Sequence, residues 1–258
     1  MALQRFIPFC FLLLSLSSCG QGVTTVDARV ADNTIPVPVD TAPRKLRNFA
    51  RFEKEILKFE EYDRAGMPAA GGILFVGSSS VRLWKTVAQD MAPLPVVNRG
   101  FGGATIGEIN YYFRRIVAKY KPRLLVFYAG ENDLFNPDTP VDSVVNDFNR
   151  FRDSMDVYLP QCRMFFIGVK PSPARWEFED KFLEANLCFQ EICSKDPRWD
   201  YLDVTAPMLD ATGRPRKEIY RADSLHMNST GYAEWTHIVK PALRTAWKTA
   251  SQTVPKAP

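Results

Sequence analysis

The sequence is poor in the residues that build metal centres and lacks the charged runs that typify nucleic-acid-binding proteins. Only two histidines occur among 258 residues, and the five cysteines show no metal-ligand spacing. Basic residues outnumber acidic residues by only 33 to 29, and no basic run exceeds a few residues. We therefore expect neither a metal site nor a nucleic-acid partner.

Long apolar runs are also scarce, and the one at the N-terminus is too short to span a membrane. Arg5 precedes an apolar stretch over residues 6–16, whereas a membrane-spanning helix needs roughly 20 residues. This pattern predicts a secretory signal peptide over residues 1–18. Its end, Leu16-Ser-Ser-Cys19, resembles the lipobox of bacterial lipoproteins, which implies that Cys19 is lipidated.

A lipidated cysteine would hold the protein on a membrane surface without crossing the bilayer. We expect an exported protein that is lipid-anchored through Cys19 to a bacterial cell membrane, at the outer membrane or the periplasmic face. The alternative is an ordinary signal peptide in which the cysteine is incidental.

The rest of the chain predicts a tether followed by one domain. Residues 19–43 are rich in Thr, Val, Asp and Pro without a sustained helical period, which is typical of a flexible linker. Residues 44–250 predict a single domain, and the polar residues 251–258 predict a frayed tail. Three cysteines fall within the domain, and we expect them to be buried as small hydrophobic residues: Cys162, Cys188 and Cys193.

Within the domain, short apolar runs alternate with segments of helical periodicity. The runs that predict strands are residues 73–76, 95–98, 124–129, 164–169 and 201–204. The segments that predict helices are residues 49–66, 106–120, 145–159, 178–192 and 232–243. This alternation predicts an α/β fold: a three-layer α/β/α sandwich around a flavodoxin-like, parallel, five-stranded sheet.

Four short polar motifs stand at or near the ends of predicted strands. They are Gly77-Ser-Ser-Ser80, Gly100-Phe-Gly-Gly-Ala-Thr105, Gly130-Glu-Asn-Asp133 and Asp223-Ser-Leu-His226. Each motif alone is equally typical of a turn, and the last could be a helix cap. The carboxyl ends of parallel strands share one edge of the sheet, where ligands bind in open α/β folds. The four motifs together therefore predict one catalytic site.

The four motifs resemble the sequence blocks of the SGNH hydrolases, also called the GDSL esterases and lipases. The resemblance covers residues 73–232 and implies the SGNH hydrolase fold. It implies a catalytic triad and an oxyanion hole. The residues that it assigns to the triad are Ser79, His226 and Asp223. The donors that it assigns to the oxyanion hole are the backbone N–H groups of Ser79 and Gly103 and the side-chain amide of Asn132.

One position departs from the family pattern. The family often has Asp directly before its nucleophile, where this sequence has Ser78. Counting from Gly77 places the nucleophile on Ser79 and leaves Ser78 as the alternative. The family's triad Asp lies in the last block, so this departure does not affect Asp223.

The chemistry of these residue types agrees with their implied roles. A serine hydroxyl is a weak nucleophile until a base removes its proton, and histidine has a reference pKa of about 6.5. Asp223 precedes His226 by three residues and can orient its ring. Asn132 offers a neutral donor to an oxyanion, whereas ionised Asp133 cannot donate and is expected to brace the turn. The second histidine, His237, lies in the predicted C-terminal helix and is expected to be structural.

These predictions indicate a serine carboxyl-ester hydrolase that forms an acyl-enzyme and needs no cofactor. Its expected substrate is a small-molecule, carbohydrate or lipid-type ester with a small acyl group, because no long apolar stretch resembles a lipase lid. Arg82, Trp84 and Arg175 are expected to contact this substrate. Two alternatives remain open: an O-acyltransferase that uses the same site, and a non-catalytic, flavodoxin-like lipoprotein that binds phosphate or flavin.

Overall fold

A computed structural model describes residues 49–252 of the chain. The predicted signal peptide, the lipidated Cys19 and the tether of residues 19–43 lie outside the described residues. Helix α8 (Ser229–Gln252) extends two residues past the predicted start of the tail, and the rest of that tail is also outside the described part. Within residues 49–252, no helix is both long enough and apolar enough to cross a bilayer.

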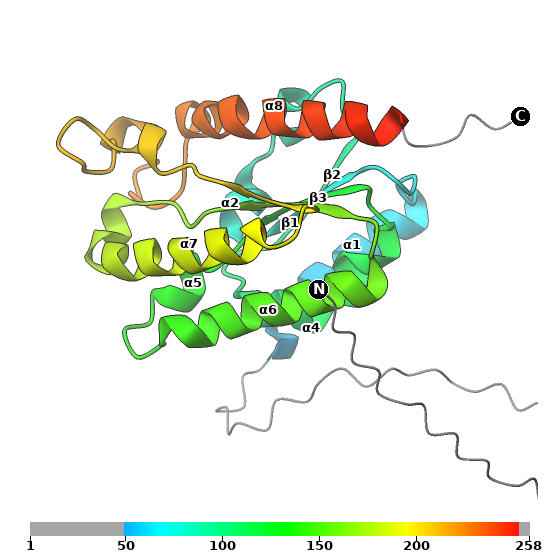
Figure 1. Cartoon of the computed structure of the whole chain (residues 1–258), viewed down its shortest axis with the longest axis horizontal. Helices are drawn as coiled ribbons and strands as arrows, with labels where there is room; N and C mark the ends of the chain where they lie inside the picture. The colour runs from blue at the N-terminus through cyan, green and yellow to red at the C-terminus, as the bar shows by residue number, and fades with distance from the viewer. Residues whose placement is uncertain (1–48, 253–258) are drawn as a thin grey trace, which may run out of the picture. The chain divides into compact units, whose positions relative to one another are not determined.

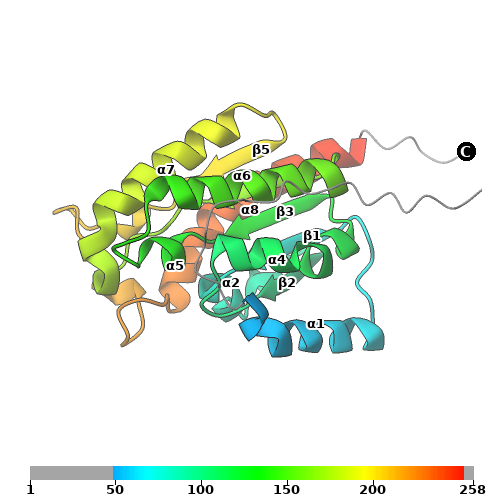
Figure 2. The ribbon, with the colours of Figure 1, turned by 90° about the horizontal axis from the view of Figure 1, so that it is seen from below.

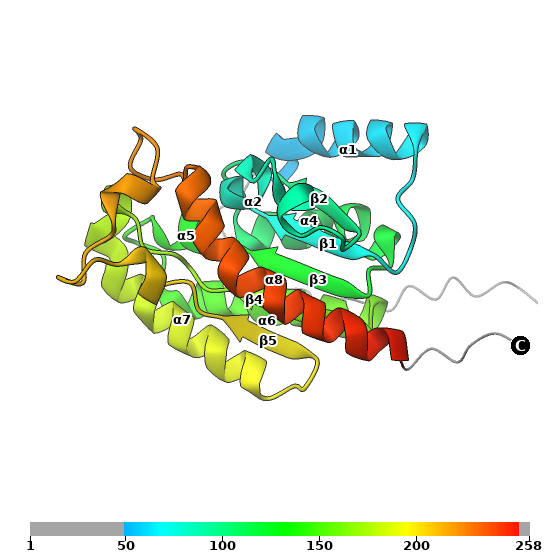
Figure 3. The same cartoon turned by 90° about the horizontal axis from the view of Figure 1, so that it is seen from above.

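Five parallel strands form the central sheet in the order β2-β1-β3-β4-β5, as Figure 3 shows. Their bounds are β1 (Ile73–Gly77), β2 (Val96–Gly100), β3 (Leu124–Tyr128), β4 (Arg163–Ile167) and β5 (Trp199–Leu202). The predicted five-stranded parallel sheet is therefore confirmed. Only β5 is displaced from its predicted range, because Trp199 already pairs with Met164 of β4.

Helices cover both faces of the sheet, which confirms the predicted three-layer sandwich (Figures 1 and 2). The core on one face involves α1 (Glu53–Ala65), α4 (Ile106–Ile116), α6 (Val141–Tyr158) and α7 (Glu179–Ser194). The core on the other face involves α2 (Ser79–Leu83), α3 (Val87–Asp90) and α8. Within β3, Leu125 and Phe127 enter the first core, whereas Val126 and Tyr128 enter the second. Both faces of the strand are thus buried, which explains its uninterrupted apolar run.

The strand order places a topological switch point between β1 and β3. The chain runs from β1 outward to β2 and then returns past β1 to β3, after which the strands continue to the opposite edge. The connections that leave the carboxyl ends of β1 and β3 therefore diverge and open a crevice between them. Gly77-Ser-Ser-Ser80 and Gly130-Glu-Asn-Asp133 begin at these two ends.

The cysteines largely follow the sequence expectation. Cys162 and Cys193 are buried, Cys188 is half-buried, and none of the three forms a disulfide within the described residues. Desolvation raises the pKa of the Cys162 and Cys193 thiols to about 12. These two thiols therefore remain protonated at neutral pH and behave as small hydrophobic groups.

Candidate active site

Ser79 stands at the tight junction between β1 and α2. Gly77 has a φ of 152°, and a Cβ at this position would lie 2.1 Å from the carbonyl oxygen of Tyr128. Only glycine allows the backbone to pass so close to β3. The N–H of Ser78 then donates to the Tyr128 carbonyl at 3.0 Å, and Ser79 begins α2. This junction exposes Ser79 at the switch point.

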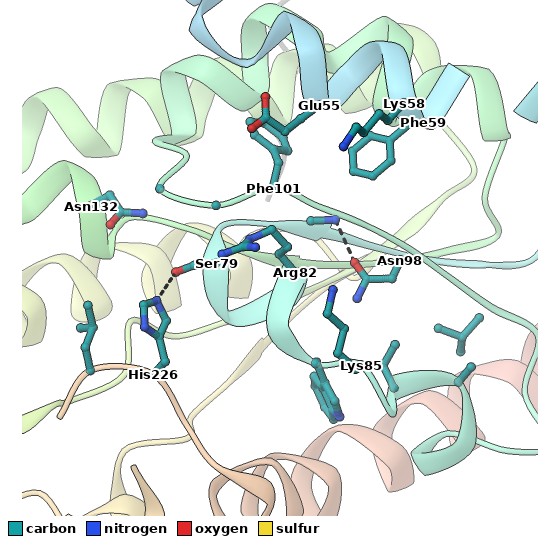
Figure 4. A pocket seen from close by; sticks show the side chains of 18 of the residues that line it. Glu55, Lys58, Phe59, Ser79, Arg82, Lys85, Asn98, Phe101, Asn132 and His226 are labelled. Atoms are coloured by element: carbon teal, nitrogen blue, oxygen red, sulfur yellow. Dashed lines mark hydrogen bonds between the residues drawn. The ribbon is translucent and has the colours of Figure 1, made fainter. Parts of the chain in front are cut away.

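Ser79, His226 and Asp223 form a continuous hydrogen-bonded chain. Ser79 Oγ lies 2.9 Å from His226 Nε2, and His226 Nδ1 lies 2.7 Å from Asp223 Oδ2. Figure 4 shows Ser79 and His226 pointing toward each other from α2 and from the loop before α8. Because the Asp223 carboxylate only accepts, Nδ1 carries the ring proton, and Nε2 is free to accept from the serine hydroxyl. The structure thus brings the three predicted residues together in the order of nucleophile, base and carboxylate.

The Asp223-Ser-Leu-His226 loop is organised around the Asp223 carboxylate. The backbone N–H groups of Leu225 and His226 donate to Asp223 Oδ1 at 3.0 and 2.9 Å, and Ser224 adopts a left-handed φ of 55°. Helix α8 is capped instead by Asn228, whose Oδ1 accepts from the N–H groups of the first helical turn. The motif is therefore not the helix cap that the sequence left open.

Hydrogen bonding keeps Asp223 ionised. Desolvation alone would raise the pKa of this carboxyl group. The hydrogen bonds from the His226 ring and from the backbone N–H groups of His226 and Leu225 outweigh that effect and lower the pKa to about 2. A carboxylate at this position can hold the ring tautomer and stabilise a positively charged imidazole.

The geometry favours Ser79 over Ser78 as the nucleophile. The Ser78 side chain is only 1% exposed, and its Oγ has no hydrogen-bond partner among the described residues. Ser79 is half-buried and lines a cleft of about 880 Å³ together with His226. Only Ser79 therefore combines contact with the base and access to the cleft.

The loop that carries Gly103 is held in place by a hydrogen bond from Arg51 to the Gly103 carbonyl oxygen. Gly103 has a φ of 75° and lines the same cleft as Ser79. Arg51 Nη2 donates to the Gly103 carbonyl at 3.0 Å. The loop then enters α4 through a capping box in which Thr105 and Glu108 satisfy each other's backbone N–H groups.

Asn132 reaches the cleft from α5 (Glu131–Leu134), directly after β3. Its Nδ2 donates to the Ala104 carbonyl at 3.0 Å, and its Oδ1 accepts from Arg175 Nη2 at 3.1 Å. A primary amide carries two N–H groups, so one remains available to a ligand. The two contacts fix which atom is nitrogen, and Figure 4 shows that nitrogen directed toward the side of the cleft where Ser79 lies.

Asp133 braces the turn, as the sequence predicts. The N–H of Ile106, the first residue of α4, lies 3.1 Å from Asp133 Oδ1 and 3.3 Å from Oδ2. The carboxylate also lies at the positive end of the α4 helix dipole. Asp133 thereby joins the segment of Asn132 to the loop of Gly103. The predicted side-chain donor and the predicted backbone donor of Gly103 are therefore held in fixed relative positions.

The three predicted substrate contacts have different outcomes. Arg82 lines the cleft with an exposed side chain. Arg175 also borders the cleft, but its guanidinium donates to the Glu131 carbonyl at 3.0 Å and to Asn132 Oδ1. Arg175 therefore holds the Glu131-Asn132 segment in place.

The prediction for Trp84 is corrected by its burial. Its side chain is 0% exposed, stacks on Tyr232 with ring centroids 5.3 Å apart, and donates through Nε1 to Asp90 Oδ2 at 2.6 Å. Helix α2 is so short that Trp84 already turns inward against β1, where Phe75 meets its ring edge-on. Trp84 supports the cleft from beneath and presents no surface to a substrate.

A buried lysine, which sequence reasoning missed, connects the two halves of the site. Lys170 follows β4 and is 0% exposed. Its Nζ donates to the Leu225 carbonyl at 2.9 Å and to Glu131 Oε1 at 3.1 Å, while the Tyr128 hydroxyl donates to Glu131 Oε2 at 2.6 Å. Desolvation lowers the pKa of the Lys170 amine, against the opposing charge of Glu131. The only sequence signals were a lysine directly after a strand and a glutamate inside the third motif.

His237 plays no part in this arrangement. It lies on α8 with an exposed side chain, away from the residues that line the cleft. This placement agrees with the expectation that His237 is not catalytic.

Comparisons with known proteins agree with the geometry. Residues 69–234 match the GDSL-like Lipase/Acylhydrolase family. No curated protein sequence matches the chain.

Several solved structures share the fold. A GDSL-like lipase from Bacteroides thetaiotaomicron is 19% identical, with a TM-score of 0.64 over 77% of this chain and 99% of that chain. A carbohydrate esterase family 3 protein from Talaromyces cellulolyticus is 14% identical, with a TM-score of 0.56 over 69% and 99% of the two chains. A catalytic mutant of an acetylxylan esterase from Geobacillus stearothermophilus is 13% identical, with a TM-score of 0.56 over 69% and 95%.

Proposed function

The chain belongs to the GDSL-like lipase/acylhydrolase family and is an ester-bond hydrolase, and from this premise we propose that Ser79, His226 and Asp223 are its catalytic triad. The observation that carries this proposal is the hydrogen-bonded chain from Ser79 Oγ through both ring nitrogens of His226 to Asp223. Serine hydrolases on unrelated folds share this arrangement of roles.

In the proposed acylation step, Ser79 Oγ attacks the ester carbonyl carbon while its proton passes to His226 Nε2. The carbonyl oxygen becomes an oxyanion, which the N–H groups of Ser79, Gly103 and Asn132 stabilise. Collapse of this intermediate breaks the bond to the alcohol oxygen, which leaves with the proton from His226. The product is an ester of Ser79, and Asp223 stabilises the imidazolium that exists between the two proton transfers.

Deacylation reverses these roles with water as the nucleophile. His226 Nε2 removes a proton from water, and the water oxygen attacks the acyl carbon of the acyl-enzyme. The same three donors stabilise the second oxyanion. Ser79 then leaves with the proton from His226, and the carboxylic acid is released.

We further propose that the substrate carries a small acyl group on a carbohydrate or lipid-type alcohol. Support comes from the neighbours described as an acetylxylan esterase and as a carbohydrate esterase, which share this fold. Neither the O-acyltransferase nor the flavin- or phosphate-binding alternative gains support from these comparisons. Turnover of p-nitrophenyl esters with acyl chains of two to twelve carbons should be fastest with the shortest chains, and a preference for twelve carbons would contradict this proposal.

Export and lipid anchoring through Cys19 remain proposals that rest on the sequence alone. The motif Leu16-Ser-Ser-Cys19 supports them. In bacteria fed a labelled fatty acid, the parent chain should carry the label in the membrane fraction and the Cys19→Ala variant should not. An unlabelled parent chain would contradict this proposal.

A covalent probe tests the assignment of the nucleophile. A fluorophosphonate should form one adduct with the parent enzyme, and peptide mass spectrometry should locate that adduct on Ser79. Turnover should disappear in proportion to labelling, and the Ser79→Ala variant should not react. An adduct on Ser78, or full turnover after complete labelling, would overturn the assignment.

A further inference from the structure

We propose that the cleft binds an anionic group, a carboxylate or a phosphate, on the alcohol portion of the ester. This inference rests on the proposed esterase function and specifies its substrate class. The lining residues include four cationic side chains and a single acidic one, Glu55. The cationic side chains are Lys58, Arg82, Lys85 and Arg175.

Three of these cations have no acidic partner within residues 49–252. Neither Lys58, Arg82 nor Lys85 forms a hydrogen bond or ion pair there through its side chain, and all three are exposed. Most arginines elsewhere in the domain are paired; Arg99 and Asp63, for example, approach to 2.6 Å. Unpaired cations gathered along one cleft raise the local concentration of anions and favour their binding.

These cations surround the space beside the nucleophile. Figure 4 shows Arg82 between Ser79 and Asn98, with Lys58 and Lys85 approaching from opposite sides of the cleft. Lys58 projects from α1, whereas Arg82 belongs to α2 and Lys85 follows it. Elements on both sides of the cleft therefore supply positive charge to a single space.

Glycine in the second motif makes room for Arg82. A Cβ at Gly102 would lie 2.8 Å from Arg82 Nε and 3.1 Å from its Cζ, so the guanidinium lies across this residue. Gly102 directly precedes Gly103, a proposed oxyanion donor. The Arg82 charge is thus held close to the reacting ester, where its planar fork can bind a carboxylate or phosphate through two hydrogen bonds.

The size of the cleft indicates that the anionic group belongs to the alcohol portion of the ester substrate. A volume of about 880 Å³ lies in the range of sites for drug-sized ligands and far exceeds the needs of a small acyl group. The remaining space must therefore hold the alcohol. Phe59 and Tyr62 of α1 line it as well, and the Tyr62 side chain is 63% exposed. An aromatic wall beside cations suits a sugar ring that bears a negative charge.

Three matched acetyl esters test the proposal. Each carries one acetyl group at O3: methyl glucoside as the neutral reference, methyl glucuronoside for the carboxylate and methyl glucoside 6-phosphate for the phosphate. The readout is kcat/KM for each anionic ester divided by kcat/KM for the neutral ester. This ratio should be at least about ten in the parent at low salt and should fall as salt rises. The larger of the two ratios identifies the preferred anion.

Variants then locate the binding site. Arg82→Gln and the double variant Lys58→Gln/Lys85→Gln should each lower the ratio by about tenfold, which corresponds to the loss of about one charge-assisted contact. Lys195→Gln removes an exposed charge directly after α7 and outside the cleft, and should leave all three kcat/KM values unchanged. A parent ratio of one or less, or variants that lower both kcat/KM values equally, would overturn the proposal.

Binding to the Ser79→Ala variant separates this inference from the esterase proposal. Calorimetry should detect glucuronate or glucose 6-phosphate binding more tightly than glucose, and Arg82→Gln should abolish the difference. Turnover of the neutral ester without any such difference would refute the anionic subsite alone. Failure to hydrolyse any ester would refute the esterase function, and the binding result would then decide the subsite by itself.

Discussion

Two carboxyl groups in this domain have very different pKa values because their surroundings differ. At Asp223, hydrogen bonds lower the pKa to about 2 although the side chain is 48% exposed. At Glu179, desolvation raises the pKa to about 7, because the side chain is 9% exposed and its Oε2 has no partner among the described residues. Hydrogen-bond donors therefore keep Asp223 ionised, whereas burial favours the protonated form of Glu179.

Asp223→Asn should lower kcat for a p-nitrophenyl ester by about 10²-fold or more. An amide can donate as well as accept, so it does not force the ring proton onto Nδ1 as an acceptor-only carboxylate does, and it carries no charge to stabilise the imidazolium. KM should change much less than kcat. Asp153 is an exposed carboxylate of α6 outside the cleft, so Asp153→Asn is the matched control and should retain full activity. Equal activity of the two variants would show that Asp223 is not in the triad.

Glu179→Gln should stabilise the protein at alkaline pH and not at acidic pH. Because burial raises the folded-state pKa, the folded protein binds the Glu179 proton more tightly than the unfolded chain does. The free energy of unfolding therefore falls as the pH rises from about 4.5 to about 7. The substitution should therefore raise the free energy of unfolding at pH 8 by roughly 1 to 3 kcal/mol and leave it unchanged at pH 4. Urea denaturation at both pH values measures this difference.

Glu177→Gln provides the comparison for that experiment, because Glu177 is an exposed neighbour on the preceding 3-10 helix. It should have little effect at either pH. If Glu179→Gln gave the same change at pH 4 and pH 8, the proposed burial of an unpaired carboxylate would be wrong.

Among the secondary-structure elements, the connection after β4 holds the site together. Lys170 contacts both the loop that carries His226 and the helix that carries Asn132, through Leu225 and Glu131 respectively. A second cation, Arg175, reaches the same helix from the following 3-10 segment. The segments that carry His226 and Asn132 are therefore joined through buried polar contacts, which are costly to break.

Lys170→Met should destabilise the domain by about 3 to 5 kcal/mol, because it leaves Glu131 buried without its closest cation. The double variant Lys170→Met/Glu131→Gln should recover part of this loss, since it removes the unpaired charge as well. Urea denaturation of the two single variants and the double variant gives the coupling energy. Strictly additive effects, or a loss below about 1 kcal/mol for Lys170→Met, would contradict this description of the network.

Sequence patterns predicted the strands and the long helices better than the short helices. The strands were evident because burial on both faces leaves uninterrupted apolar runs, as in residues 124–129. Helices α2, α3 and α5 span only four or five residues, which is too short for a helical period to be visible. The error at Trp84 has the same origin, since the direction of that side chain depends on where α2 ends.

The site was predictable in its motifs but not in its supports. Ser79, Asn132 and His226 lie in short motifs beside strand ends, so their convergence follows from a parallel sheet. The pairing of Lys170 with Glu131 joins residues 39 positions apart, and no local pattern announces it. Such contacts depend on tertiary packing, which composition and periodicity do not specify.

For the molecule as a whole, the sheet order decides which motifs meet. The reversal between β1 and β3 brings Ser79 and Asn132 to one crevice, and β2 beside β1 adds the loop of Gly103. The chain after β5 then returns across this edge to supply His226 before it enters α8. One cleft thereby receives the proposed nucleophile, base and oxyanion donors together with the cations of the proposed anionic subsite.

The first measurement should compare kcat/KM for p-nitrophenyl acetate among the parent, Ser79→Ala and Ser78→Ala, each checked for an unchanged melting temperature. We expect Ser79→Ala to lose activity by about 10³-fold or more, because no other hydroxyl in contact with His226 Nε2 is found in the described residues. Ser78→Ala should retain most of its activity, since the Ser78 hydroxyl is buried away from the base. Activity that survives Ser79→Ala in a folded protein would contradict the proposed triad.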